Sequence, residues 1–271
     1  MAYKFDHEWR RERERLATIE SAYDPWTIRT IEATGPEQGW RCLEVGGGGG
    51  SIAEWLCHRV GESGRVTATD LETRFLSGID AANLEVRTHD IVSDPLEEGF
   101  YDLVHTRAVL EHIPERGEVV HRLISALKPG GWLTVDCGDF SSVRQVSGRP
   151  EDRGFFKEAF EAVTGTSRGF GADLLYGGRI GEVFRDGGLD QVSVEGFITE
   201  WDQAHPLGSL FDLTFQRLER PAIETGSIDR EDFDRLLEVM RSTDFKALSH
   251  IFYSARGRRP APDEGLQTTD S

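Results

Sequence analysis

The segment RCLEVGGGGGSIAEWL occupies residues 41–56 and decides the fold of this chain. An apolar run leads directly into five glycines, and apolar residues then recur at Ile52, Leu56 and Val60. This order predicts a strand, a glycine turn and a helix, which together open a nucleotide-binding βαβ unit. Glycine is needed where the backbone turns sharply and touches a ligand, because any Cβ would block the approach. The start of the helix presents unpaired N–H groups at the same place.

The spacing of the glycines separates two classes of nucleotide cofactor. A dinucleotide-binding turn follows the pattern Gly-x-Gly-x-x-Gly/Ala, and Gly46-x-Gly48-x-x-Ser51 misses its third position. The pattern that fits is Glu44-x-Gly46-x-Gly48-x-Gly50. It resembles motif I of the class I S-adenosylmethionine-dependent methyltransferases.

Four further segments resemble later motifs of this family. Asp70 ends a short apolar strand about 20 residues beyond the glycines, where a ribose-binding carboxylate belongs. Asp90 ends the next strand; in the family such an acid accepts from the adenine amino group, and the following amide, here that of Ile91, donates to the ring. Residues 100–114, FYDLVHTRAVLEHIP, resemble motif IV of the group that includes the ubiquinone and menaquinone biosynthesis methyltransferases. Residues 127–136, LKPGGWLTVD, resemble the turn into the fifth strand.

The resemblance implies S-adenosyl-L-methionine as the cofactor and assigns its binding residues. Arg107 ends the fourth strand, where the family contacts the methionine end of the cofactor. The full set of implied cofactor-binding residues is Glu44, Gly46, Gly48, Gly50, Asp70, Leu71, Asp90, Ile91 and Arg107.

The alternation of apolar and polar segments predicts an α/β fold with a doubly wound, seven-stranded Rossmann-like sheet and a helical cover. The family implies the strand order 3-2-1-4-5-7-6, with the last strand antiparallel. We expect one domain over residues 1–256, with an N-terminal helical lid (1–34), a cofactor-binding core (41–140), substrate cover elements (141–188 and 206–242) and a disordered tail (257–271). Within the lid, one helix is predicted over residues 4–20 and a second from Asp24-Pro25, where Asp caps and Pro occupies the first turn. Later helices are predicted over 151–163, 179–186, 207–218 and 229–240.

Candidate catalytic residues follow from the chemistry of methyl transfer, an in-line displacement that needs an aligned acceptor and exclusion of water. Where the acceptor carries a proton, a histidine or a carboxylate is the usual base. Three residues are candidates: His105 near the end of the fourth strand, Asp139 at the end of the fifth, and His205 in the cover. A buried structural role competes for His105. Glu111 and His112 match the family motif, which favours a structural role at a helix start.

Composition limits the partners. Acidic residues outnumber basic residues by 48 to 31, and the formal net charge is −17. Such a surface repels phosphate backbones and anionic lipids, so neither a nucleic acid nor a membrane is expected as a partner. The three cysteines lack Cys-x-x-Cys spacing, which argues against a zinc site or a disulfide framework, and no bound metal is expected. The N-terminal residues do not resemble a signal peptide and no long apolar run could span a bilayer, so we expect a cytoplasmic protein.

Together these features predict a methyltransferase acting on a small, apolar or aromatic metabolite of the natural-product type, which would be its methyl acceptor. The cover is rich in aromatic residues, and this suits such a substrate. Two alternatives stay open: a dinucleotide-dependent oxidoreductase, and a protein that binds S-adenosylmethionine without turnover. The sequence also leaves the acceptor atom open, and a homodimer is one of its possible oligomeric states.

Overall fold

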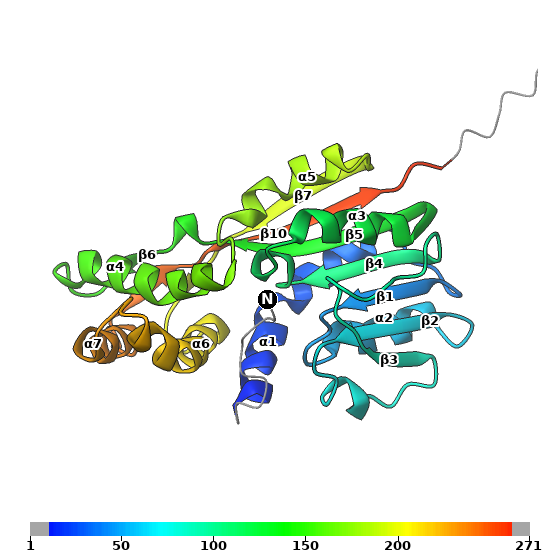
Figure 1. Ribbon diagram of the computed structural model, residues 1–271. Helices are drawn as coiled ribbons and strands as arrows, with labels where there is room; N and C mark the ends of the chain where they lie inside the picture. The colour runs from blue at the N-terminus through cyan, green and yellow to red at the C-terminus, as the bar shows by residue number, and fades with distance from the viewer. Residues whose placement is uncertain (1–10, 262–271) are drawn as a thin grey trace, which may run out of the picture.

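A seven-stranded sheet forms the centre of the molecule in the computed structural model, which describes residues 11–261 (Figure 1). Its strand order is β3-β2-β1-β4-β5-β10-β7. The strands are β1 (Arg41–Val45), β2 (Arg65–Asp70), β3 (Leu84–Thr88), β4 (Tyr101–Arg107), β5 (Leu127–Asp139), β7 (Asp190–Phe197) and β10 (Ile251–Arg258). The pairs from β3 to β5 are parallel, whereas β10 runs antiparallel to both of its neighbours. The predicted order, with an antiparallel last strand, is confirmed.

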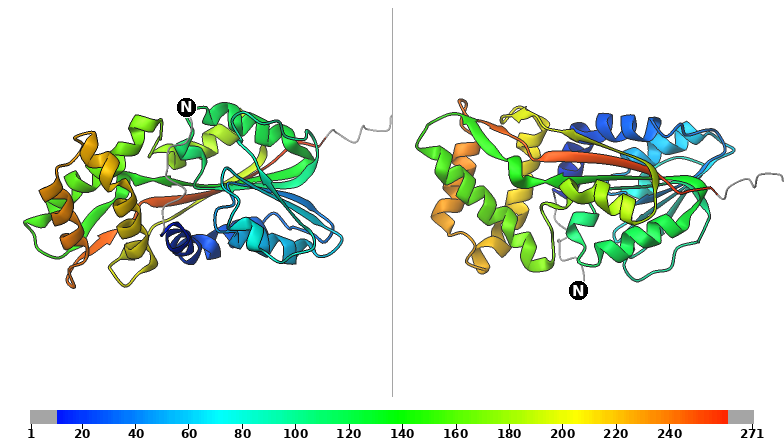
Figure 2. Two further views of the ribbon diagram at one scale, coloured as in Figure 1. Left: turned by 60° about the horizontal axis from the view of Figure 1, so that its bottom comes forward. Right: turned by 90° about the horizontal axis from the view of Figure 1, so that it is seen from above.

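Helices cover both faces of this sheet, as Figure 2 shows. The helices α1 (Glu12–Glu32) and α2 (Ser51–Val60) lie on one face, and α3 (Arg116–Ala126) and α5 (Ile180–Asp186) lie on the other. Successive side chains of a strand point to opposite faces, so Cys42 packs in one hydrophobic cluster with α2 while Leu43 packs in another with α3. Because both faces are covered, most residues of β1, β2 and β4 are buried, whereas β3 at the edge of the sheet is mostly half-buried.

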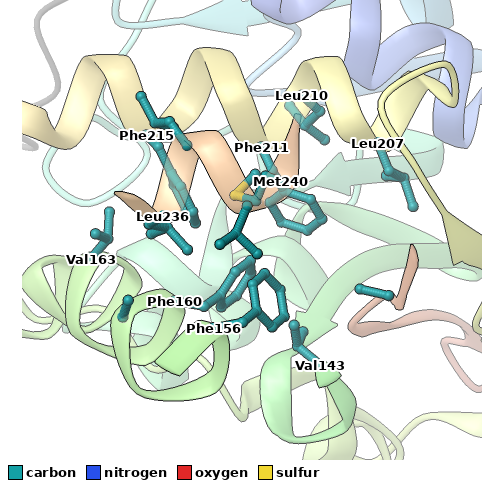
Figure 3. Packing of buried hydrophobic residues seen from close by; sticks show 14 of the residues in the cluster. Val143, Phe156, Phe160, Val163, Leu207, Leu210, Phe211, Phe215, Leu236 and Met240 are labelled. Atoms are coloured by element: carbon teal, nitrogen blue, oxygen red, sulfur yellow. The ribbon is translucent and has the colours of Figure 1, made fainter. Parts of the chain in front are cut away.

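A smaller cover lies beyond one end of the sheet and has a sheet of its own, which the sequence did not predict. Its strands, in the order β6-β9-β8, are β6 (Arg144–Ser147), β8 (Glu200–Trp201) and β9 (Lys246–Leu248). Its helices are α4 (Asp152–Gly165), α6 (Pro206–Glu224) and α7 (Arg230–Met240). These three helices share a core that includes Phe156, Phe160 and Phe215 (Figure 3). The predicted helices at 151–163, 207–218 and 229–240 correspond to α4, α6 and α7.

Short 3-10 turns link several of these elements. They are η1 (Leu76–Gly78), η2 (Leu110–His112), η3 (Phe140–Ser142), η4 (Thr166–Phe170) and η5 (Tyr176–Arg179). Within residues 11–261, the helices are too short or too polar to cross a bilayer.

The break predicted at Asp24-Pro25 is wrong, because α1 continues through Pro25 to Glu32. The Asp24 carboxylate does not cap a helix; it accepts hydrogen bonds from Ser51 and Arg107. Packing of Tyr23 and Ile31 in the core then holds one helix across the proline. Residues 4–10 of the predicted first helix lie outside the described residues.

Two other boundaries differ from the prediction. Helix α5, placed by the sequence among the cover elements at 141–188, packs on the main sheet, where Phe184 lies in the same cluster as Leu133 and Val135. Gly257 and Arg258, predicted to begin a disordered tail, lie in β10 and pair with β5. A strand at this position completes the sheet between β5 and β7. Residues 262–271 of the predicted tail lie outside the described residues.

Candidate active site at the carboxyl edge of the sheet

A cavity of about 910 Å³ lies between the main sheet and the cover. Its walls come from the glycine turn, the carboxyl ends of β1, β2 and β4, helix α1, and helix α6 of the cover. The chain winds from β1 outward to β3 and then returns to β4 on the other side of β1, so this is a topological switch point. Ligands of open α/β sheets bind at such points, and the volume falls within the range of small-molecule sites.

The glycine turn at residues 46–50 can be built only from very small residues. Gly46 and Gly48 have φ values of +70° and +53°, and Gly50 has φ +95° as the N-cap of α2. A Cβ on Gly46 would lie 2.3 Å from a methyl group of Val109, and one on Gly48 would lie 3.2 Å from Leu16 of α1. The turn therefore brings bare backbone to the cavity. Gly46 and Gly48 line the cavity, whereas Gly50 does not appear among its described lining residues.

Two carboxylates border the cavity at the ends of β2 and β3. Asp70 accepts from the Gly48 amide at 2.9 Å and, with its other oxygen, from the Glu72 amide at 3.1 Å. Asp90 accepts from the Val92 amide at 2.9 Å. Both acids line the cavity together with Leu71 and Ile91, and Leu71 is an exposed apolar side chain at its rim.

A buried cluster of charged groups lies beneath the glycine turn. Arg107 donates to Asp24 of α1 at 2.7 Å, and Asp136 accepts from Thr27 of the same helix. Burial raises the pKa of the Glu44 carboxyl well above its usual range, although the Arg107 guanidinium opposes this effect. Glu44 Oε2 is buried and has no hydrogen-bond partner among residues 11–261. Glu44 and Arg107 both line the cavity.

None of the three predicted catalytic residues is among the described residues that line the cavity. His105 is fully buried in β4, with Nδ1 3.0 Å from the Thr134 hydroxyl, and burial lowers its pKa to about 3. The Asp139 carboxylate accepts from Ser141 N and caps η3. His205 Nδ1 accepts from Leu207 N at the start of α6. These contacts give each side chain a structural role, and a catalytic role for any of them stays a prediction.

Two further residues that line the cavity were not predicted from the sequence. Tyr23 of α1 and His250, which follows β9, form a buried pair with Tyr23 Oη 3.0 Å from His250 Nε2. No sequence motif includes either residue, and 227 positions separate the two. Glu111 also lines the cavity, although its motif suggested only a helix start.

The comparisons with known proteins agree with this geometry. Residues 43–135 match a family described as a methyltransferase domain. This segment belongs to that family. The methyltransferase domain contains the glycine turn, Asp70, Asp90 and Arg107, and it ends within β5.

Curated relatives of the methyltransferase domain are bacterial proteins. The chain is 32% identical over 117 residues to a ubiquinone biosynthesis O-methyltransferase of Burkholderia orbicola (strain MC0-3), covering 41% of this chain and 49% of the relative. It is 30% identical over 118 residues to a ubiquinone/menaquinone biosynthesis C-methyltransferase of Pseudomonas entomophila, covering 41% and 46%. The chain thus spans about half the length of the curated relatives it matches.

Solved structures extend the likeness in fold to most of the chain. A phosphoethanolamine N-methyltransferase 2 of Haemonchus contortus, in complex with S-adenosyl-L-methionine, superposes with a TM-score of 0.54 at 19% identity, over 88% of this chain and 53% of that one. The YcgJ protein of Bacillus subtilis gives a TM-score of 0.57 at 12% identity, over 89% and 100%. The cyclase SpnF gives 0.50 at 16% identity, over 88% and 82%. The methyltransferase-type fold is therefore shared well beyond residues 43–135.

Proposed function

We propose that this protein is an S-adenosylmethionine-dependent methyltransferase that acts on a small apolar or aromatic molecule. The observation that carries the proposal is the convergence of the glycine turn and two strand-end carboxylates, Asp70 and Asp90, on one cavity of a methyltransferase domain. The relatives are named as an O-methyltransferase of ubiquinone biosynthesis and a C-methyltransferase of ubiquinone and menaquinone biosynthesis, and the structural neighbour is named as an N-methyltransferase.

The residues at the glycine turn suit S-adenosylmethionine. The Asp70 carboxylate, held beside Gly48, has oxygen lone pairs left for the two hydroxyls of a ribose, and Asp90 could accept from an adenine amino group. Glu44 Oε2 is buried 4.0 Å from His105 Nε2 and accepts no hydrogen bond from the described residues. This oxygen and the Arg107 guanidinium are an acceptor and a donor for an amino-acid group. When bound, the cofactor supplies a methyl group on a positively charged sulfur.

The protein's own residues would align the acceptor and exclude water. Leu16 of α1 lies over the glycine turn, and Glu20 and Arg13 of the same helix lie beside Gly49. Helix α1 therefore covers the end of the cavity at the glycine turn, and Phe211 of α6 lines the opposite wall. Exclusion of water strengthens electrostatic interactions inside such a site and holds the reacting groups in line.

A protein that binds the cofactor without transferring methyl groups is the second candidate. It is favoured by the position of His105, Asp139 and His205 outside the described cavity lining. A dinucleotide-dependent oxidoreductase is disfavoured by the glycine spacing, since Ser51 occupies the third small position of that fingerprint.

Isothermal titration calorimetry with S-adenosylmethionine, S-adenosylhomocysteine and NAD separates these candidates. We expect micromolar binding of S-adenosylhomocysteine and no binding of NAD at the same concentrations. Transfer of labelled methyl groups to a panel of small phenols, anilines and quinols then separates the methyltransferase from a protein that only binds. Binding of NAD without S-adenosylhomocysteine would overturn the proposal.

A further inference from the structure

The inner end of the cavity differs in chemistry from the end at the glycine turn. Aromatic side chains line it from four elements, and we call this region the aromatic chamber. Its members are Tyr23 of α1, Phe140 of η3, Phe211 and Phe215 of α6, and Phe252 of β10. Flat apolar walls of this kind favour a ring compound over a charged or branched one.

The hydrogen-bonded pair of Tyr23 and His250 lies within the aromatic chamber, and an aromatic ring stacks on each of the two side chains. The Tyr23 ring stacks on Phe252 with centroids 3.9 Å apart, and the His250 ring stacks on Phe140 at 4.4 Å. Burial lowers the pKa of His250 to about 4 and raises that of Tyr23, so both side chains are neutral at pH 7. His250 Nδ1 is buried without a hydrogen-bond partner in the described part of the chain. In either tautomer, the neutral pair keeps one N–H or O–H donor beyond the bond that joins it.

A buried carboxyl group borders the same chamber. Glu111 of η2 is 4% exposed, and its Oε1 accepts a long hydrogen bond, 3.4 Å, from the Gly138 amide. Its Oε2 is buried and has no nitrogen or oxygen hydrogen-bond partner among the residues that the structure describes, and the Cys137 thiol also hydrogen bonds to this carboxyl. A Cβ added to Gly138 would lie 3.2 Å from His250 Cδ2, so Glu111 and His250 both border this glycine. Buried polar atoms are nearly always satisfied, and an unsatisfied one calls for an explanation.

We propose that Glu111, Tyr23 and His250 form the polar end of an acceptor subsite for an aromatic ring that carries a hydroxyl group. The inference rests on the proposed function and deepens it by naming the class of acceptor. The hydroxyl hydrogen bonds to Glu111 Oε2, and the hydroxyl oxygen accepts from the Tyr23–His250 pair. As the acceptor reacts, its O–H bond breaks, the proton goes to Glu111 and the electron pair stays on the oxygen. Glu111 is then a catalytic residue, and Tyr23 and His250 are positioning residues.

The protonation of Glu111 fits this role. Burial raises its pKa to about 7, the region where a general base is most effective. The titratable groups that face it are Asp136 and Cys137 of β5, Tyr176 of η5, and Tyr23 of α1. Burial raises the pKa values of the thiol and of both phenols, so they stay protonated below pH 8. Glu111 is therefore mainly ionised at pH 8 and mainly protonated at pH 6.

Calorimetry on the full chain saturated with S-adenosylhomocysteine tests the proposal. The probes are 2-naphthol and 2-methylnaphthalene, which match in shape and differ in the hydroxyl group. At pH 8 we expect 2-naphthol to bind about tenfold more tightly or better, because its hydroxyl donates to a buried carboxylate. The preference should shrink at pH 6, where Glu111 is protonated. The affinity for S-adenosylhomocysteine, measured first, tests the proposed function separately.

Glu111→Gln is the decisive variant, and Glu118→Gln is its control. Gln keeps the shape of the side chain and loses the charge, so the preference for 2-naphthol should fall below threefold and become independent of pH. Glu118 is exposed on α3 and is not among the described residues that line the cavity, so its replacement should leave the preference intact. Melting curves report whether each variant is folded. If Glu111→Gln is unfolded, Tyr23→Phe gives the second test. It removes the hydroxyl group that pairs with His250 and keeps an aromatic ring stacked on Phe252.

Three results would overturn the proposal. The first is equal binding of the two probes by the wild-type protein. The second is an absence of binding by either probe. The third is a preference, with its pH dependence, that survives in folded Glu111→Gln or, if that variant is unfolded, a preference of unchanged size in Tyr23→Phe.

Discussion

Asp70 holds the end of β2 and the glycine turn together through its two carboxylate oxygens. It was identified from its position alone, because a strand-end acid about 20 residues beyond a glycine turn is a local pattern. Tyr23 and His250 could not be paired in the same way. Only the packing of α1 against β10 brings these two residues to 3.0 Å, and no local pattern encodes that contact.

At this scale, Asp70→Ala should weaken S-adenosylhomocysteine binding by about 10- to 100-fold. The change removes hydrogen bonds to a charged group, worth roughly 1.5–3 kcal/mol, and also frees the Gly48 amide. Calorimetry measures the effect, and Asp80→Ala, at an exposed position after η1, is the matched control. Unchanged affinity in Asp70→Ala would remove Asp70 from the cofactor site.

Glu111→Gln should also change how stability depends on pH. The pKa of Glu111 is raised in the folded state, from 4.5 to about 7, so the folded protein binds the extra proton between these values. Its contribution is fully present below pH 4.5 and is lost as pH rises through 7. Relative to wild type, the variant should therefore gain about 2–3 kcal/mol in free energy of unfolding between pH 5 and pH 8. Urea titrations at both pH values measure this gain, and parallel pH profiles would contradict the prediction.

At the scale of elements, α1 joins three parts of the molecule. Leu16 lies over the glycine turn, Ile31 packs with α2, and Glu12 forms a buried ion pair with Arg217 of α6 at 3.1 Å. The sequence indicated a helical lid but divided it at Pro25, because Asp-Pro is a common helix start. Tertiary contacts allow the helix to continue, because the Asp24 carboxylate accepts hydrogen bonds from Arg107 and Ser51 instead of capping the backbone of its own helix.

Glu12→Gln should loosen this tie between α1 and α6. Both partners are less than a tenth exposed, and Glu12 also pairs with Arg15 at 2.8 Å. The neutral variant leaves both guanidinium groups without their carboxylate, and breaking a buried pair in this way costs about 3–5 kcal/mol. Hydrogen exchange over residues 12–20 should become faster, while exchange in β1 and β4 stays slow. Glu14→Gln, which removes an exposed pair with Arg11, is the control. Equal exchange in Glu12→Gln and wild type would show that the Glu12–Arg217 pair does not hold α1 in place.

At the scale of the whole molecule, the hydrophobic cluster of the cover differs from the two clusters on the faces of the main sheet, although it also includes Tyr23 of α1 and Phe252 of β10. The order of the main sheet could be predicted, since five motifs fall in sequence along it. The β6-β9-β8 sheet could not, because its strands have two to four residues and their paired residues lie about 45 to 105 positions apart in the sequence. Trp201 of β8 and Ala247 of β9 lie in the same hydrophobic cluster as the helices α4, α6 and α7, so the second sheet depends on tertiary packing (Figure 3).

Phe160→Ala should open the cover and spare the sheet. Phe160 is 2% exposed and contacts Phe156, Phe211 and Phe215, so its loss should cost about 3–5 kcal/mol. We expect faster hydrogen exchange in α4, α6 and α7, with S-adenosylhomocysteine affinity within a few-fold of wild type. Leu123→Ala, in the cluster of the main sheet, should instead raise exchange throughout the sheet. A Phe160→Ala protein that exchanged uniformly faster would show one cooperative unit.

The position of β10 has a consequence for synthesis on the ribosome. This strand pairs with β5 on one side and β7 on the other, yet it is made after both of them, at residues 251–258. Until it leaves the exit tunnel, β5 and β7 both present open edges, and such edges pair readily with other chains. A nascent chain stalled before residue 250 should therefore need a chaperone to stay dispersed, even though β1 to β5 can already be folded.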